Sequence, residues 1–173
     1  MAQDNPDRKW LNIILTGFAN SGKSTVGWIV ADLMRWRFVS VEEEIETRFG
    51  KSREQVIEED GQDKFLRYES MICQSLTAQT DQVVATSTET LLNPANLTMM
   101  EATGLVICLH ADADVIRERM VGGKGTQMEW GWEFDHEERI EQYAIIEHHI
   151  DTSHQTPQEV ADDVVSLWHS VSL

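Results

Sequence analysis

The chain has 173 residues, a length that suits one hydrophobic core, so we expect a single domain over residues 1–173. Its 30 acidic residues outnumber 14 basic ones, and the resulting formal charge of -16 argues against nucleic acid as a partner. No apolar run approaches the roughly 18 residues of a membrane span, and the N-terminus shows no export signal. We therefore expect a cytoplasmic protein without a membrane partner.

The first half of the chain predicts strands and helices in alternation. A β-strand precedes the first helix, and a capping box of Ser52 and Gln55 opens a later helix that Gly61 interrupts. In chain order we predict a strand at 10–16, a helix at 24–35, a strand at 38–39, helices at 42–49, from Ser52 to Gly61 and at 63–78, and a strand at 82–85.

The second half continues the alternation but contains one irregular stretch. In chain order we predict a helix from Asn93-Pro94, a strand at 105–109, a helix that Asp112 caps, an irregular segment at 121–135, and then a helix at 140–147, a strand at 149–151 and a helix from Thr156. Scattered glycines in the irregular segment suggest a mobile lid. Strands that alternate with helices indicate an α/β fold with a parallel sheet covered on both faces.

The clearest motif is Gly17-Phe18-Ala19-Asn20-Ser21-Gly22-Lys23-Ser24, which matches the phosphate-binding loop G-x-x-x-x-G-K-[ST]. A strand before it and a helix after it are the context that the mechanism requires. Gly17 and Gly22 permit turns that expose backbone N–H groups to phosphate oxygens. We expect Lys23 to contact the β and γ phosphates and Ser24 to coordinate Mg²⁺. The motif predicts ATP with Mg²⁺ as cofactors.

Other residues of the loop are expected to complete the nucleotide contacts, namely Asn20 and Ser21, with Thr25 on the side of the α-phosphate. The alternative is a glycine-rich turn that matches the pattern by chance. A second string, Gly50-Lys51-Ser52, has Ile45 where the first glycine should stand, so we interpret it only as a helix break.

Together with this loop, the stretches IETRFG at 45–50, GQDKFLRYE at 61–69 and the segment from Arg139 to Tyr143 make the chain resemble the shikimate kinases over nearly its whole length. The resemblance implies the three-layer P-loop kinase sandwich with a five-stranded parallel sheet, a closing lid, and transfer of the ATP γ-phosphate to a small-molecule hydroxyl. It also implies that Arg139 binds the acceptor and that residues 152–157 lie against adenine.

Nucleotide contacts outside the loop are accordingly expected at Arg119, Thr156 and Pro157. The departures from the family pattern fall on the acceptor side. Ser40 and Glu42 occupy the positions after the second strand where the family has two aspartates.

Three further departures remove groups that the family uses to hold shikimate. Ser87-Thr88-Glu89 replaces three glycines, Leu66 replaces a carboxylate-binding arginine, and Gln127 replaces an arginine of the lid, where Lys124 is the only cation. Arg67 is next to Leu66 but points about 100° around the helix. Each lost charge-assisted hydrogen bond is worth roughly 1.5 to 3 kcal/mol, so shikimate is expected to be a poor substrate.

Several side chains leave two interpretations open. Glu42 is our candidate catalytic base or orienting group, against a solvated helix face, and Glu89 either assists the metal or the acceptor or lies on a surface loop. Trp130 and Trp132 either anchor the lid against the body or face the acceptor. If the two tryptophans face the acceptor, they and the carboxylates of Glu42 and Glu89 would bind a neutral or cationic group better than a carboxylate.

The leading hypothesis is an ATP-dependent small-molecule kinase, monomeric or weakly dimeric, with Lys23, Glu42 and Arg139 as its catalytic residues. The alternative is a non-catalytic ATP-binding or regulatory protein on the same fold, because several acceptor-side groups differ from the family. A nucleic-acid-associated P-loop ATPase is disfavoured by the net charge.

Overall fold

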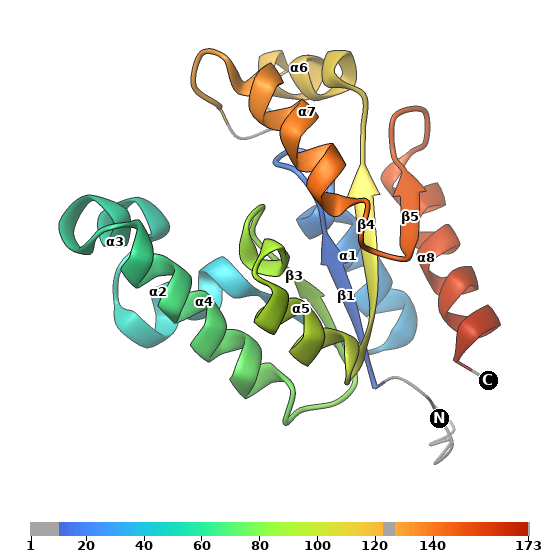
Figure 1. The fold of residues 1–173 in the computed structure, drawn as a ribbon. Coiled ribbons are helices and arrows are strands. Elements are labelled where there is room, and N and C mark those ends of the chain that lie inside the picture. The colour runs from blue at the N-terminus through green and yellow to red at the C-terminus, as the bar shows by residue number, and fades with distance from the viewer. Residues whose placement is uncertain (1–10, 123–126, 173) are drawn as a thin grey trace.

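The computed structural model describes residues 11–122 and 127–172. Within these ranges, five parallel strands form one sheet in the order β2-β3-β1-β4-β5, which confirms the expected α/β fold (Figure 1). The strands are β1 Asn12–Thr16, β2 Arg37–Ser40, β3 Gln82–Ala85, β4 Gly104–His110 and β5 His148–Asp151. Because all five run the same way, their carboxyl ends meet at one edge of the sheet.

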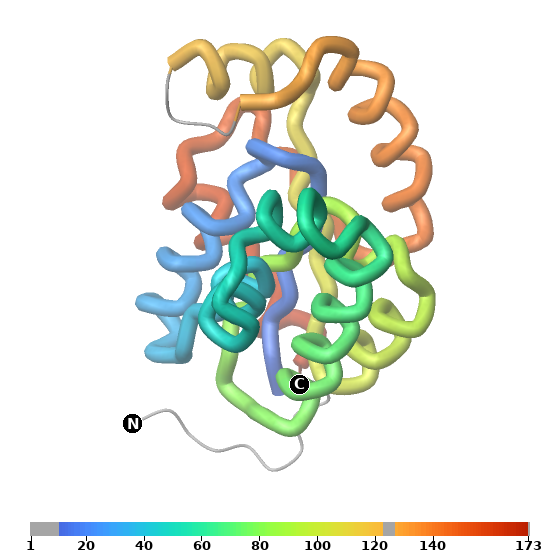
Figure 2. Tube along the Cα trace, turned by 90° about the vertical axis from the view of Figure 1, so that its left-hand side faces the viewer, coloured from blue at the N-terminus to red at the C-terminus, as the bar shows by residue number. Residues whose placement is uncertain are grey.

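Helices cover both faces of this sheet, as the two perpendicular views show (Figures 1 and 2). One face carries α1 and α8, which pack against each other, and the other face carries α4 and α5. The helices are α1 Lys23–Met34, α2 Val41–Phe49, α3 Arg53–Asp60, α4 Gln62–Leu76, α5 Pro94–Glu101, α6 Ala113–Val121, α7 Trp132–Tyr143 and α8 Pro157–Val171, with a short 3-10 helix, η1, at Thr90–Leu92.

Strand β1 lies at the centre of the sheet and separates two hydrophobic cores. Ile13 and Leu15 face the core formed with α1 and α8, whereas Ile14 faces the core formed with the helices on the other side. All three side chains are at most 1% exposed. Successive side chains of β1 point to opposite faces of the sheet, and both faces are buried. The sequence of this strand is therefore a continuous hydrophobic run.

The helix ends follow the predicted capping signals with one difference. Capping boxes are present at Ser52 and at Thr156, and Asn93 caps α5 ahead of Pro94. Asp112 stands at the N-cap of α6 as predicted, but its side chain makes no capping hydrogen bond. Instead, the backbone N–H of Asp112 donates a hydrogen bond to Ser153 Oγ at 2.9 Å.

The irregular segment is shorter than the range 121–135 predicted for a lid. Helix α6 includes Val121, and α7 begins at Trp132, well before the predicted helix start at Ile140. Trp132 is 8% exposed and belongs to the core, whereas Trp130 is 99% exposed. The glycines in this segment suggested an irregular conformation, but Trp132 and His136 lie one turn apart on the buried face of α7.

Part of the predicted lid, including Gly123, Lys124 and Gly125, lies outside the described residues. Its mobility stays a prediction. Trp130 does not anchor this segment against the body of the protein, because its side chain is almost fully exposed. Trp132 does pack against the body, but as the first residue of α7.

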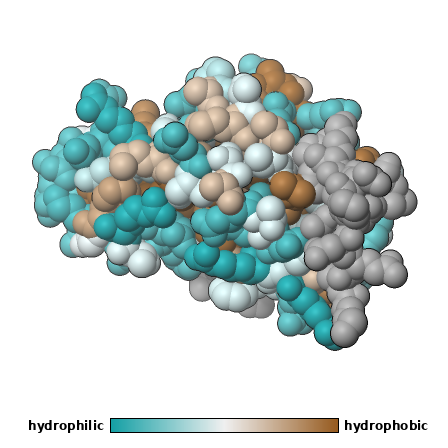
Figure 3. All heavy atoms as spheres, turned by 90° about the horizontal axis from the view of Figure 1, so that it is seen from below, coloured by the Kyte–Doolittle hydropathy of each residue, from teal (hydrophilic) through white to brown (hydrophobic). Residues whose placement is uncertain are grey.

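The face at the amino ends of the strands shows a mixed surface. Figure 3 views the molecule from this side, and the coloured residues there combine hydrophilic areas with small, separate hydrophobic patches. Across residues 11–122 and 127–172, no helix is long and apolar enough to cross a bilayer. The side chains predicted to be functional gather at the opposite edge, where the strands end.

Candidate active site

A cavity of about 930 Å³ opens at the carboxyl ends of the strands. The phosphate loop and the start of α1 line one part of it. Side chains from α2, α3, the segment after β3, and α7 line another part, including Glu42, Arg53, Glu89 and Arg139. A volume in this range can hold a nucleotide with a small second ligand.

The backbone of the phosphate loop has the shape that its glycines predict. Gly17 and Gly22 have φ angles of 139° and 105°, which other residues rarely adopt. A Cβ atom at Gly17 would lie 2.1 Å from the carbonyl oxygen of Leu109 in β4, so no side chain fits there. Among the described residues, no side chain caps the N-terminus of α1, which leaves its first N–H groups available to an anion.

Lys23 spans the loop in this structure. Its Nζ donates hydrogen bonds to the carbonyl oxygens of Gly17 and Phe18, both at 2.8 Å. Burial lowers the pKa of Lys23 to about 8, although the nearby carboxylate of Glu42 raises it in part. Phosphate groups beside the ammonium would favour its charged form, so the site is suited to a ligand with several negative charges.

Hydroxyl groups in the loop also fit a phosphate ligand. Ser21 is fully buried, and within the described part of the chain its Oγ has no hydrogen-bond partner. Ser24 and Thr25 are exposed to the cavity that they line. Ser24 is thus accessible to a metal ion bound with phosphates, as Mg²⁺ commonly is.

Arg119 of α6 holds the phosphate loop against the end of β5. Its guanidinium donates to the carbonyl oxygen of Asn20 at 2.7 Å and to that of Thr152 at 2.8 Å. The hydroxyl of Thr152 donates to the carbonyl oxygen of Ser21 at 2.9 Å. Burial lowers the pKa of Arg119. Arg119 therefore lies beside the loop, where a nucleotide contact was expected.

The two residues expected against adenine are placed differently. Pro157 lines the cavity together with Gln155. Thr156 does not belong to the lining, because its side chain caps α8 and bonds Glu159. Thr156 is therefore better explained as a helix cap than as a nucleotide contact.

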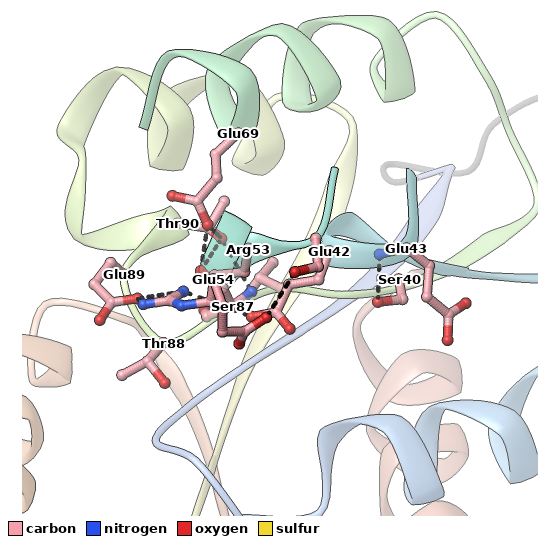
Figure 4. Close-up of polar contacts among 12 residues, drawn as sticks. Ser40, Glu42, Glu43, Arg53, Glu54, Glu69, Ser87, Thr88, Glu89 and Thr90 are labelled. Atoms are coloured by element: carbon pink, nitrogen blue, oxygen red, sulfur yellow. Dashed lines mark hydrogen bonds and ion pairs between the residues drawn. The ribbon is translucent and has the colours of Figure 1, made fainter. Parts of the chain in front are cut away.

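Glu42 stands in the first turn of α2, directly after β2. Ser40 caps this helix, since its Oγ accepts a hydrogen bond from the backbone N–H of Glu43 at 3.3 Å. Both Ser40 and Glu42 line the cavity, and the carboxylate of Glu42 lies 3.6 Å from the guanidinium of Arg53 (Figure 4). Glu42 therefore faces the site rather than only solvent.

Arg53 is a functional candidate that the sequence analysis missed. Both of its terminal nitrogens donate to one oxygen of Glu89, Oε2, at 3.2 Å, and its guanidinium lies 4.8 Å from the ring centroid of Phe65. Figure 4 shows it between Glu42 and Glu89. The only local signal was its position after the cap Ser52, because Glu89 follows 36 positions later in the chain.

The segment Ser87-Thr88-Glu89 is held in place by its neighbours. The buried carboxylate of Glu69 accepts hydrogen bonds from the hydroxyls of Ser87 and Thr90, and its burial raises its pKa (Figure 4). Tyr143 of α7 donates to the carbonyl oxygen of Thr88. Glu89 is paired with Arg53, so it is not an unattached surface-loop carboxylate.

Arg139 lies at the border of two cavities. It lines the main cavity and a neighbouring one of about 730 Å³, and it donates to Gln142 Oε1 at 2.7 Å. Leu66 lines the second cavity only. Arg67 is exposed and is not among the described residues lining either cavity, so it does not replace the missing cation.

Gln127 also lines the main cavity, and its side-chain amide donates to the carbonyl oxygen of Met120 at 3.0 Å. An amide held in this way supplies no positive charge. Lys124, the cation expected nearby, lies outside the described residues.

A family model and similar curated proteins identify the family of this chain. Residues 19–168 match the family model described as shikimate kinase. A shikimate kinase of Desulforudis audaxviator is 35% identical over 155 residues, which cover 86% of this chain and 82% of that protein.

Solved structures show the same fold. The shikimate kinase of Acinetobacter baumannii, solved in complex with shikimate, has a TM-score of 0.84 at 22% identity, over 97% of this chain and 98% of that one. The shikimate kinase of Aquifex aeolicus has a TM-score of 0.79 at 25% identity, over 92% and 97% of the two chains. The phosphate loop, the sheet order and these matches together show that the chain is an ATP-dependent kinase that belongs to the shikimate kinase family.

Proposed function

We propose that the protein transfers the γ-phosphoryl group of ATP, bound with Mg²⁺, to a hydroxyl of a small molecule. The observation that carries this proposal is a single cavity lined both by the phosphate loop and by Glu42, Arg53, Glu89 and Arg139. A phosphate donor and an acceptor can therefore meet in one cavity, which is the main requirement for phosphoryl transfer.

Each of these residues has a proposed role in binding or in phosphoryl transfer. The N–H groups of the phosphate loop and the ammonium of Lys23 hold the phosphates, and Ser24 is the proposed metal ligand. When bound, Mg²⁺ would offset the negative charge of the phosphates. Glu42 orients the acceptor hydroxyl and accepts its proton, and Arg139 positions the acceptor.

Shikimate is the compound named for the relatives, and it is the first acceptor to test. We expect turnover below the range of about 1 to 100 per second that is typical of kinases. Leu66 and Gln127 supply no cation, and the guanidinium of Arg53 is already paired with Glu89.

The test is a phosphotransfer screen with ATP, Mg²⁺ and a panel of small alcohols that includes shikimate. ADP formation above an ATP-only control, with a phosphorylated product seen by mass spectrometry, would support a kinase. The Lys23→Ala variant, purified in the same way, controls for contaminating kinases. Tight ATP binding without any phosphorylated product would instead favour the non-catalytic alternative.

We also propose that the protein works in the cytoplasm as a monomer or weak dimer. Support comes from Cys73 and Cys108, which are both buried free thiols suited to a reducing compartment. Burial raises the pKa of each thiol to about 12, so neither is reactive near neutral pH. Size-exclusion chromatography with light scattering would test the oligomeric state.

A further inference from the structure

The charges that line the main cavity are unevenly distributed. Of its four described cations, Lys23 and Arg119 bond the backbone of the phosphate loop, which leaves Arg53 and Arg139 for the acceptor. The acidic residues in the described lining number five, namely Glu42, Glu54, Glu89, Glu129 and Asp135. Away from the phosphate loop, negative charge therefore exceeds positive charge.

Arg53 is also largely committed to other groups. Both terminal nitrogens contact Oε2 of Glu89, Glu42 lies 3.6 Å from one of them, and the guanidinium lies against the ring of Phe65. An acceptor carboxylate could approach Arg53 only beside two carboxylates that already neutralise it. Such an approach is repulsive, or it separates Arg53 from Glu89 and leaves Glu89 partly buried without its partner.

Glu89 itself offers a contact of the opposite kind. Its Oε2 receives both bonds from Arg53, and within the described ranges no group donates to its Oε1. Glu89 is 25% exposed and lines the cavity, so a ligand hydroxyl or ammonium can donate to it. A carboxylate accepts hydrogen bonds but cannot bind another carboxylate without a shared proton.

We propose that the acceptor is a small molecule with a hydroxyl group that is neutral or cationic where it meets Glu89, and that the Arg53–Glu89 ion pair sets this preference. The inference rests on the proposed function, because it concerns the acceptor of that reaction. Selectivity then comes from repulsion of anionic acceptors as much as from attraction of neutral ones.

Three probes with the same ring hydroxyls test the preference. They are shikimate, its uncharged methyl ester, and the analogue in which an aminomethyl group replaces the carboxylate. Binding to the protein saturated with Mg-ADP is measured by calorimetry, and kcat/KM is measured with ATP. We expect the ester and the amine to bind at least about tenfold more tightly than shikimate, since one unfavourable charge contact at this range is worth that much.

Two variants should shift the preference in opposite directions. Glu89→Gln keeps the size of the side chain but removes its charge, so binding of shikimate relative to the ester should rise on the order of tenfold. Arg53→Gln leaves Glu89 without its cation, so binding of the amine relative to the ester should rise by a similar factor. Glu58→Gln, an exposed position of α3 outside the cavity, is the matched control and should change neither ratio.

The outcomes separate this inference from the proposed function. Tighter binding of shikimate than of the ester, or no binding of the ester and amine, overturns the inference. If both variants lose affinity for all three probes by the same factor, the inference is also overturned, because the Arg53–Glu89 ion pair would then have only a structural role. If the ester and amine bind as expected but neither these probes nor any alcohol of the panel is phosphorylated while ATP is bound, the binding preference stands and the proposed kinase reaction fails.

Discussion

The two ends of the cavity are built in different ways. The phosphate end comes from one continuous stretch, residues 17–25, in which backbone geometry and a single lysine are proposed to bind the phosphates. The acceptor end is assembled from α2, α3, the segment after β3, and α7, and it depends on side chains that meet across the fold. The phosphate end can therefore keep its phosphate-binding loop while side-chain substitutions at the acceptor end change which acceptor binds.

The largest expected effect concerns the phosphate end. Lys23→Ala should reduce turnover by about 10³-fold, because it removes the cation that is proposed to face the transferred charge. Lys51→Ala is the matched control, since Lys51 also follows a glycine and precedes a serine but only pairs with Glu59 and Asp60 at the surface. Steady-state kinetics and ATP titrations measure both. Equal effects of the two variants would contradict the phosphate-loop assignment.

Trp132 links the two ends, because its ring packs 6.3 Å from that of Phe18 in the loop while α7 also carries Arg139. Trp132→Ala should lower the free energy of unfolding by about 3 kcal/mol through loss of core packing. Trp130→Ala should change it by less than about 0.5 kcal/mol, because that side chain is exposed. Urea unfolding of the two variants measures the difference, and similar losses would show that Trp130 is buried in solution.

Glu42 should matter for the acceptor end while leaving the phosphate end almost intact. Glu42→Gln should lower kcat by about 10²-fold, as expected for loss of a catalytic base, with little change in ATP affinity. Glu43→Gln is the control, since Glu43 is exposed and does not line the cavity. A fall in kcat that is equal in both variants would assign Glu42 to the solvated face of α2.

The smallest effect is a pH dependence of ATP binding. Burial places the pKa of Lys23 at about 8 in the free protein, and bound phosphates would raise it. At pH 8 binding should therefore take up about half a proton, and affinity should fall as the pH rises above 8.

Calorimetry in buffers with different ionisation enthalpies measures this proton uptake. The Lys23→Ala variant is the control, because it lacks the titrating ammonium and should show less uptake. Proton release on ATP binding near pH 8, or affinity that rises with pH, would mean that Lys23 is not the group facing the phosphates.

Much of the fold could be predicted from the sequence, because capping residues and hydrophobic patterns act over short distances along the chain. Capping residues at Ser52 and Thr156 and the hydrophobic run of β1 set these elements through nearby contacts. The start of α7 was predicted wrongly, because glycines and aromatic residues before Ile140 suggested an irregular segment. Only packing against the core shows that Trp132 lies on a buried helical face.

For the candidate site, the sequence by itself determined the phosphate loop, since glycine conformations and the following helix need only adjacent residues. It also indicated that Glu42 follows a strand end. The tertiary structure alone decided that Arg53 lies between Glu42 and Glu89. Ion pairs between separate elements depend on how those elements pack, and no local spacing in the chain encodes that distance.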